Sequence, residues 1–183
     1  MSEPRTAPPR AAVVAAAVLV GLLAVGVVVA SRFAPDAGQE QPPQVAAGPL
    51  GLVPVDAPQA TAPECAGLLA ALPRELPSGG GVLAALPLAD PAPAGATAWG
   101  DRMDPVVLRC GLRKPPELTP TAALQVVSGV QWLPVRGTGS TTWFLVDRAV
   151  YAALTMPDAA GSGPLQTVSE VVAAELKAQP VDP

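Results

Sequence analysis

The chain has 183 residues, half of them hydrophobic, and it contains no histidine. Without histidine, the usual pairs of a serine or cysteine nucleophile with an imidazole base are excluded. From residue 33 onward, eight Lys and Arg stand against fourteen Asp and Glu, a net charge of −6. An acidic surface repels phosphate backbones, so nucleic acid is not expected as a partner.

The first feature along the chain is an uncharged, hydrophobic run at residues 11–31. As a helix rising about 1.5 Å per residue it spans roughly 30 Å, the thickness of the hydrocarbon core of a bilayer. Arg5, Arg10 and the amino terminus precede the run, and Arg32 alone follows closely. This asymmetry predicts a cytoplasmic head at residues 1–10 and a single-pass signal-anchor in the cell membrane, with the C-terminal part outside the cytoplasm.

Two alternatives remain open for this run. A cleaved signal peptide also has a positive head and an apolar segment, and residues 28–31 offer small side chains for a cleavage site. Its apolar segment usually has about 7–15 residues, which is shorter than the run here. A buried helix of a soluble domain is the other alternative. The length favours an uncleaved anchor.

Residues 32–61 follow the run and are rich in proline. Several glutamines and an absence of helical or strand periodicity accompany the prolines, which predicts an extended linker outside the packed core. A short edge strand at residues 50–55 is the alternative, although Pro54 weakens it.

The exported domain is predicted at residues 62–178, and its first element is a helix. Thr61 and Glu64 have the spacing of a capping box, and Pro63 suits the first turn of a helix. From Cys65 onward, apolar residues recur at helical spacing until Pro73 ends the element. Cys65 is therefore expected to face the core.

The middle of the domain reads as strands. Residues 73–98 are rich in proline and glycine and predict a long irregular connection. Tight turns are expected at residues 137–139 and 147–148. Apolar, β-branched runs predict four strands, at residues 106–110, 124–135, 141–146 and 149–156.

A closing helix is predicted at about residues 168–178, with Thr167 and Glu170 as a second capping box. A short tail, residues 179–183, follows it. Strands with hairpin-length connections between two terminal helices predict an α+β fold. We expect a small, largely antiparallel sheet flanked by an N-terminal and a C-terminal helix, and preceded by one transmembrane helix.

The two cysteines, Cys65 and Cys110, both lie in the predicted exported domain. An even count outside the reducing cytosol favours a disulfide over a metal site. Two cysteines without histidine also do not fill a zinc shell, and no metal or other cofactor is expected. Two buried free thiols are the alternative.

Few residues suggest chemistry. Asp101 and Asp104 form the one close acid pair of the domain, beside Trp99. Two carboxylates near an aromatic ring suit glycoside chemistry or a bound cation, and a solvated loop is the alternative. Trp99, Trp132 and Trp143 are expected to fill the core, and an exposed recognition surface is the alternative. Trp99, Asp101 and Asp104 are thus the candidate interaction surface, with no catalytic residue assigned.

Five short motifs occur in a characteristic order: C-x-x-L-L-x-x-L-P at residues 65–73, A-W-G-D at 98–101, V-L-R-C-G at 107–111, G-V-x-W-L at 129–133 and R-x-V-Y at 148–151. With these motifs, residues 62–178 resemble the actinobacterial family known as domain of unknown function 3515. The family consists of small proteins with one N-terminal membrane segment. The resemblance implies the anchor and the cysteine bridge, and it supplies no catalytic residue.

Three functions remain at this point. We expect a non-catalytic, membrane-anchored module of the cell envelope that binds a protein or cell-wall partner. One alternative is an envelope glycan hydrolase or transferase that uses Asp101 or Asp104. The other is a secreted carrier of a small ligand, released by signal cleavage. An acid pair in a cleft would favour the enzyme, a concave apolar pocket with polar groups the carrier, and a flat aromatic surface the partner-binding module.

Overall fold

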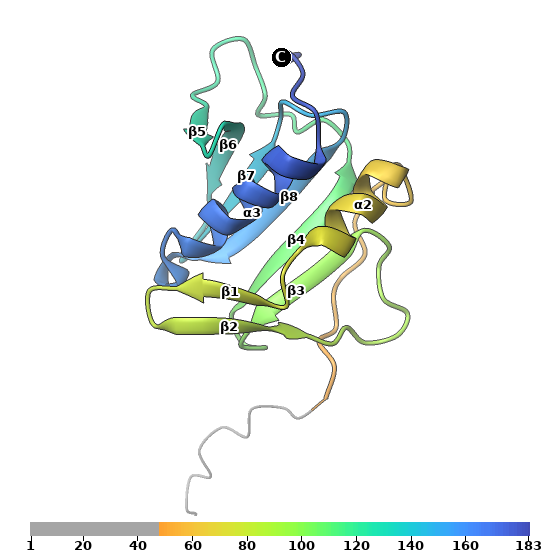
Figure 1. Cartoon of the computed structure of the whole chain (residues 1–183), viewed down its shortest axis with the longest axis vertical. Helices are drawn as coiled ribbons and strands as arrows, with labels where there is room; N and C mark the ends of the chain where they lie inside the picture. Colours follow the sequence, from red (N-terminus) through yellow and green to blue (C-terminus); the bar gives the residue numbers. More distant parts are fainter. Residues whose placement is uncertain (1–47) are drawn as a thin grey trace, which may run out of the picture. The chain divides into compact units, whose positions relative to one another are not determined.

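The structure, a computed structural model, describes residues 48–183. Within this part the chain forms one eight-stranded sheet, two α-helices and a short 3-10 helix (Figure 1). The predicted head at residues 1–10 and the predicted membrane span at residues 11–31 lie outside the described residues. None of the helices in residues 48–183 has the length and hydropathy to cross a membrane.

The sheet consists of two meanders that meet at its centre. Its strand order is β1-β2-β3-β4-β8-β7-β6-β5, and every pair of neighbours is antiparallel. The predicted α+β class with an antiparallel sheet is therefore confirmed. The elements are α2 (Pro63–Ala71), β1 (Glu75–Ser78), β2 (Gly81–Leu86), β3 (Ala96–Gly100), β4 (Pro105–Leu112), β5 (Gln125–Val127), β6 (Val130–Arg136), β7 (Ser140–Leu145), β8 (Tyr151–Pro157), η1 (Asp158–Ala160) and α3 (Gly163–Glu175).

Both helices cover the same face of the sheet, as Figure 1 shows. Helix α3 contacts β1 near one edge of the sheet, β5 and β6 near the other edge, and α2 beside it. Alternate strand residues such as Leu108, Leu145 and Leu154 point to this face and are fully buried, together with Val168 and Val172 of α3. Burial of this apolar surface, at about 25 cal/mol per Å², is the main term that stabilises the domain.

Two tryptophans are sealed in this core. Trp99 is 1% exposed, and its indole N–H donates a hydrogen bond of 2.9 Å to the carbonyl of Pro73. Trp132 is 0% exposed, and its indole N–H donates to Ser169 Oγ at 2.9 Å. A buried indole N–H needs an acceptor, and each bond also joins two elements. Trp99 links β3 to the loop after α2, and Trp132 links β6 to α3.

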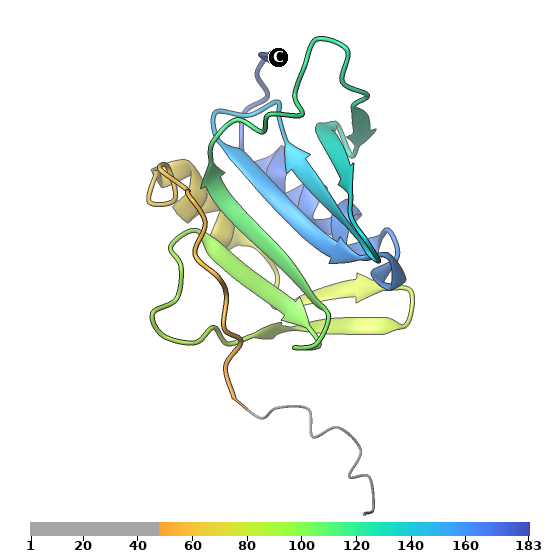
Figure 2. The same ribbon diagram turned by 180° about the vertical axis from the view of Figure 1, so that it is seen from behind.

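The opposite face of the sheet carries a second, smaller apolar cluster. The connection between β4 and β5 crosses this face in Figure 2. Its Leu118 packs with Leu133 of β6 and Val146 after β7, and Val181 of the tail joins them. The predicted tail therefore packs against the domain.

Part of the predicted linker also lies against the domain. Leu50 is buried and forms a bridge with Leu88, although no strand forms at residues 50–55. The Gln59 N–H donates a hydrogen bond of 3.0 Å to the carbonyl of Gly111. Gly111 sits at a bulge of β4 with a φ of +83°, and a Cβ there would overlap the backbone of Gln59 and Ala60. Glycine at this position allows the two segments to approach each other.

Residues 73–98 were predicted as irregular, and this is wrong. They contain β1, β2 and the start of β3. The β1–β2 hairpin turns at Gly79 and Gly80, and Pro77 lies in β1 at the edge of the sheet, where its missing N–H removes no ladder bond. The prolines and glycines that suggested a loop are therefore residues of a tight turn and of an edge strand.

The strand predicted at residues 124–135 is a hairpin, β5 and β6. Ser128 and Gly129 form its two-residue loop, with φ of +48° and +75°. Two consecutive positive φ values are those of a type I′ turn, whose twist matches that of the flanking strands. Periodicity alone does not reveal such a turn within an apolar run.

Both capping boxes were also predicted wrongly. No side-chain hydrogen bond caps α2 or α3. Helix α2 begins at Pro63, and α3 begins at Gly163, ahead of Thr167, and ends at Glu175 before the predicted boundary. A proline lies in the first turn of each helix, where its missing N–H has no intrahelical partner to lose.

The disulfide between Cys65 and Cys110 is confirmed, and the two Cα atoms are 5.6 Å apart. Both residues are fully buried. The bridge joins α2 to β4, which is the fourth strand along the chain, because β1 to β3 lie in the segment predicted as irregular. It ties the N-terminal helix to the centre of the sheet.

Replacing Cys65 and Cys110 together by alanine should lower the free energy of unfolding by about 2–5 kcal/mol, because the bridge closes a long loop in the unfolded chain. Urea titration of the full chain in detergent measures the change. Reductant added to the unsubstituted protein should lower the stability by a similar amount. Two alkylatable thiols in folded, unreduced protein would contradict the assignment.

Candidate functional site

The acid pair lies in an exposed turn. Asp101 and Asp104 follow β3, and both are exposed. Asp101 Oδ1 accepts a hydrogen bond of 2.7 Å from the Met103 N–H, and its carbonyl accepts one of 3.3 Å from the Asp104 N–H. The Asp101 carboxylate thus stabilises its own turn. This is the solvated-loop alternative, with both carboxylates exposed to solvent.

Trp99 is not a surface residue. Its side chain is buried in the core and its indole N–H is bonded to Pro73. The three residues proposed as an interaction surface therefore separate, with Trp99 inside and Asp101 and Asp104 in solvent. The expectation that the tryptophans fill the core is confirmed for Trp99 and Trp132, which are buried. Trp143 is only partly buried.

A groove of about 460 Å³ lies between the strands β5, β6 and β7 and the first turns of α3. Its floor is apolar. Trp143 of β7 and Met156 of β8 form this floor, and Val127 of β5 and Leu165 of α3 form its sides. This volume lies within the usual range of small-molecule sites, about 300–1,000 Å³.

Trp143 is half-buried, in contrast to the other two tryptophans. Its indole Nε1 has no hydrogen-bond partner in residues 48–183 and is not among the buried unpaired atoms of that part. The N–H group is therefore not fully buried, and it belongs to a side chain that lines the groove.

Polar side chains surround this floor. Gln125 of the edge strand β5 and Gln166 of α3 line it from two sides, and both are exposed. Arg136 and Asp158 are the charged residues of the lining, one of each sign. Asp158 Oδ1 accepts a hydrogen bond of 3.2 Å from the Thr141 hydroxyl, which holds the carboxylate at the end of β8.

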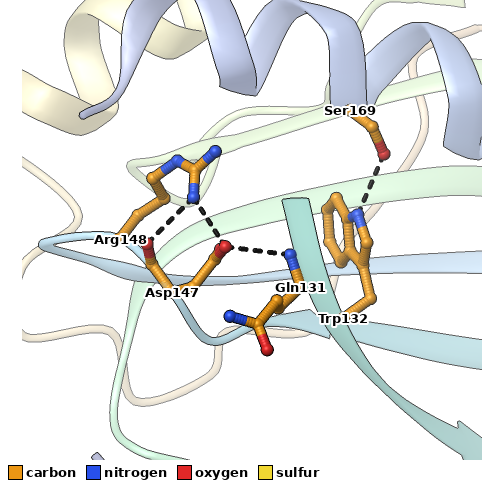
Figure 3. Close-up of polar contacts among 5 residues, drawn as sticks. All are labelled: Gln131, Trp132, Asp147, Arg148 and Ser169. Atoms are coloured by element: carbon orange, nitrogen blue, oxygen red, sulfur yellow. Dashed lines mark hydrogen bonds and ion pairs between the residues drawn. The ribbon is translucent and has the colours of Figure 1, made fainter. Parts of the chain in front are cut away.

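The position of α3 determines the width of the groove. Ser169 Oγ accepts the bond from Trp132 (Figure 3). It donates one of 2.6 Å to the carbonyl of Leu165. On the other side, a Cβ on Gly163 would overlap the carbonyl of Pro77 in β1, so the helix begins in close contact with that strand. The first turns of α3, which carry Leu165 and Gln166, are thus held beside Trp143.

A second polar cluster lies in the turn between β7 and β8, at the end of this hairpin that is away from the groove. Arg148 Nη1 lies 2.7 Å from Asp147 Oδ2, and both side chains are almost completely buried. Asp147 Oδ2 also accepts a bond of 3.0 Å from the backbone N–H of Gln131 (Figure 3). The Gln179 N–H of the tail donates to the Asp147 carbonyl at 2.9 Å. This enclosed pair holds a turn and a chain end together, and it offers no surface to a ligand.

Displaced pKa values occur away from the groove. Burial lowers the pKa of Arg109 on β4. Burial and the nearby Asp182 raise the pKa of Tyr151 on β8. The hydrogen bond and charge of Asp56 raise the pKa of the exposed Arg113. Each shift follows from local packing or pairing, and none involves a residue that lines the groove.

Sequence reasoning missed the groove because its residues come from separate segments. Gln125, Arg136, Trp143, Asp158 and Gln166 share no spacing that predicts their proximity. The available signal was a third tryptophan, in a domain with few aromatic residues, that directly follows two threonines on its strand. That signal does not distinguish a core tryptophan from an open one.

The model of the family described as Protein of unknown function (DUF3515) matches residues 12–181. The chain belongs to the DUF3515 family. The match covers the predicted membrane segment almost entirely, and the described domain nearly to its end. No curated protein and no solved structure gives a significant match to this DUF3515 chain.

Replacing Arg148 by methionine should lower the free energy of unfolding by about 3–5 kcal/mol, since the substitution leaves Asp147 charged and unpaired in the interior. A double-mutant cycle with Asp147→Asn, measured by urea unfolding, should show strong coupling between the two positions.

The matched control is Arg113→Met, which breaks the exposed pair of Arg113 with Asp56. A solvent-screened pair contributes little, so this substitution should leave stability nearly unchanged. Equal effects of the Arg148 and Arg113 substitutions would contradict a structural role for the buried pair.

Proposed function

We propose that this DUF3515 chain is a non-catalytic, membrane-anchored module of the cell envelope, and that it holds its ligand in the groove between β5–β7 and α3. The observation that carries the proposal is the open tryptophan on the groove floor. Trp99 and Trp132 are sealed in the core with bonded indoles, whereas the N–H of Trp143 is not fully buried. Tryptophan is enriched at binding sites because it combines a large apolar surface with one polar group.

The composition of the groove supports binding. Small-molecule sites are concave, with apolar walls and a few polar groups that fix orientation. Here the partly buried Trp143 supplies apolar surface, with the buried Leu165 beside it, and Gln125, Gln166 and Arg136 supply donors around it. This concave form departs from the flat aromatic patch expected for a protein-binding module and meets the criterion for a carrier of a small ligand. The proposed module therefore holds a ligand that enters the groove.

The proposed location rests on the N-terminal part of the sequence. Residues 11–31 have the length of a membrane span, and Arg5 and Arg10 precede them, which supports a cytoplasmic N-terminus. The disulfide supports an extracytoplasmic domain, since such bonds persist in oxidising compartments. A secreted carrier, released by cleavage near residue 31, has the same groove and differs only in the anchor.

The non-catalytic part of the proposal rests on the chemistry of the side chains. The chain has no histidine, and its cysteines form the disulfide. General acid–base catalysis near neutral pH would then depend on a carboxylate with a shifted pKa. Asp101 and Asp104 lie in a solvated turn, outside the groove lining, and nothing in their surroundings favours the glycan hydrolase.

A photo-crosslinking amino acid at position 166 should capture the ligand in cells that produce the full chain, because Gln166 lines the groove. The control places the same amino acid at position 170, an exposed residue of α3 outside the lining. Mass spectrometry of the crosslinked peptide identifies the adduct. Equal yields at both positions, or none at 166, would contradict a binding groove.

Asp101→Asn combined with Asp104→Asn should leave crosslinking and any cellular phenotype unchanged, because these side chains are exposed outside the groove. Circular dichroism and membrane levels provide the control for folding. Loss of the phenotype in a folded double variant would overturn the non-catalytic assignment and favour the hydrolase.

Protease added to intact spheroplasts should remove the domain and spare the short N-terminal head, as expected for an anchored protein with its N-terminus in the cytoplasm. Amino-terminal sequencing of the undigested protein tests the anchor directly. A mature chain that begins near residue 31 would contradict the anchor and favour the secreted carrier.

A further inference from the structure

We propose that the groove takes a neutral pyranose unit of a glycan, stacked on the indole of Trp143. This inference rests on the proposed function, because it assigns a ligand class to the same groove. It is carried by three properties of the lining, namely the open indole, the type of polar side chains around it, and their balance of charge.

The open indole suits a ring that is apolar on its faces and polar at its rim. One face of a pyranose presents C–H groups, which pack on an aromatic surface, while its hydroxyls point outward. Trp143 offers part of such a surface on the floor, and Met156 and Leu165 beside it are 6% and 5% exposed. Its indole N–H, which has no partner in residues 48–183, is a donor for a hydroxyl or ring oxygen.

The polar side chains of the lining are those that match hydroxyl groups. A sugar hydroxyl both donates and accepts, so it can pair with an amide, which provides both functions, with a carboxylate, which accepts, or with a guanidinium group, which donates. Gln125 and Gln166 each carry a donor and an acceptor, Arg136 carries donors, and Asp158 carries acceptors. Asp158 Oδ1 already accepts a hydrogen bond from the Thr141 hydroxyl. Asp158 Oδ2 makes no side-chain hydrogen bond in residues 48–183, so it is the acceptor that a ligand could use.

The charge of the lining argues against an anionic ligand. Among the residues that line the groove, two are charged, Arg136 and Asp158. Their charges have opposite sign, so the lining has no net formal charge. A phosphorylated or acidic ligand would meet one cation and one anion, in a domain whose overall charge is negative. A purely apolar ligand would leave the amides and charges around the floor without partners, which costs free energy for each group.

An extended peptide is less favoured than a sugar. Peptides that add to a sheet edge gain affinity from a row of main-chain hydrogen bonds. The edge strand beside the groove, β5, contains only Gln125–Val127, so it offers few such bonds.

The test is a titration of the full chain in a detergent without a sugar headgroup, since a glycoside detergent would compete. The probes are the β-1,4-linked N-acetylglucosamine trimer and cellotriose, with inorganic phosphate and trialanine as comparison ligands. Ligand-observed NMR gives the dissociation constants. The trisaccharides should bind, and phosphate and trialanine should not. Indole emission should also change, because Trp143 is the tryptophan open to solvent.

Two variants locate the binding. Trp143→Phe should weaken trisaccharide binding about tenfold, through the smaller ring and the lost donor. Gln166→Ala, an exposed position that folding does not need, should weaken it about three- to tenfold. The matched control is Glu170→Ala, exposed on the same helix outside the lining, which should bind as the unsubstituted chain does.

The outcomes separate this inference from the proposed function. Trisaccharide binding that neither groove variant weakens would overturn the assignment of the sugar to the groove. Binding of trialanine or phosphate alone, weakened by Gln166→Ala, would overturn the sugar class and leave the groove as the binding site. No binding of any probe, together with no crosslink at position 166 in cells, would overturn both.

Discussion

The position of α3 on the sheet depends on one buried hydrogen bond, from the Trp132 indole to Ser169. Ser169 lies within the helix, where a serine side chain commonly bonds to a carbonyl of the preceding turn, and here it bonds to Leu165. The hydroxyl thus accepts from the sheet and donates to the helix. Loss of the acceptor would leave the Trp132 N–H unpaired in the core, at a cost of about 1–3 kcal/mol. The bond therefore favours one alignment of α3 against β6, and that alignment leaves the groove beside Trp143.

The three tryptophans divide the domain by role. A domain with few aromatic residues has few large side chains for its core. Trp99 and Trp132 are buried and hydrogen-bonded, as a stable core requires. Trp143 remains partly open, although complete burial of its ring would add stability. Departures from the most stable packing are concentrated at functional sites, which is why the proposal for the groove rests on this residue.

Local patterns predicted the parts of the fold that local chemistry controls. The apolar run from Val106 to Cys110 predicted β4, and the apolar stripe from Cys65 predicted the inward face of α2. The cysteine count predicted the disulfide, and the structure supplies its position in the sheet. The first hairpin was missed because Pro77 and the following glycines resemble a loop when the edge of a sheet is not in view. The groove was not predictable, since Trp143 and Gln166 meet only when the sheet and α3 are assembled.

The most direct test of this account is hydrogen exchange of the three indole N–H groups, followed by NMR on the full chain in a detergent without a sugar headgroup. Trp99 and Trp132 should exchange slowly, since both indoles are buried and bonded, and Trp143 should exchange fast. Ser169→Ala should accelerate exchange at Trp132 and leave Trp99 slow. Slow exchange at Trp143 in the unsubstituted chain would show a closed floor and contradict the groove on which the proposed function rests.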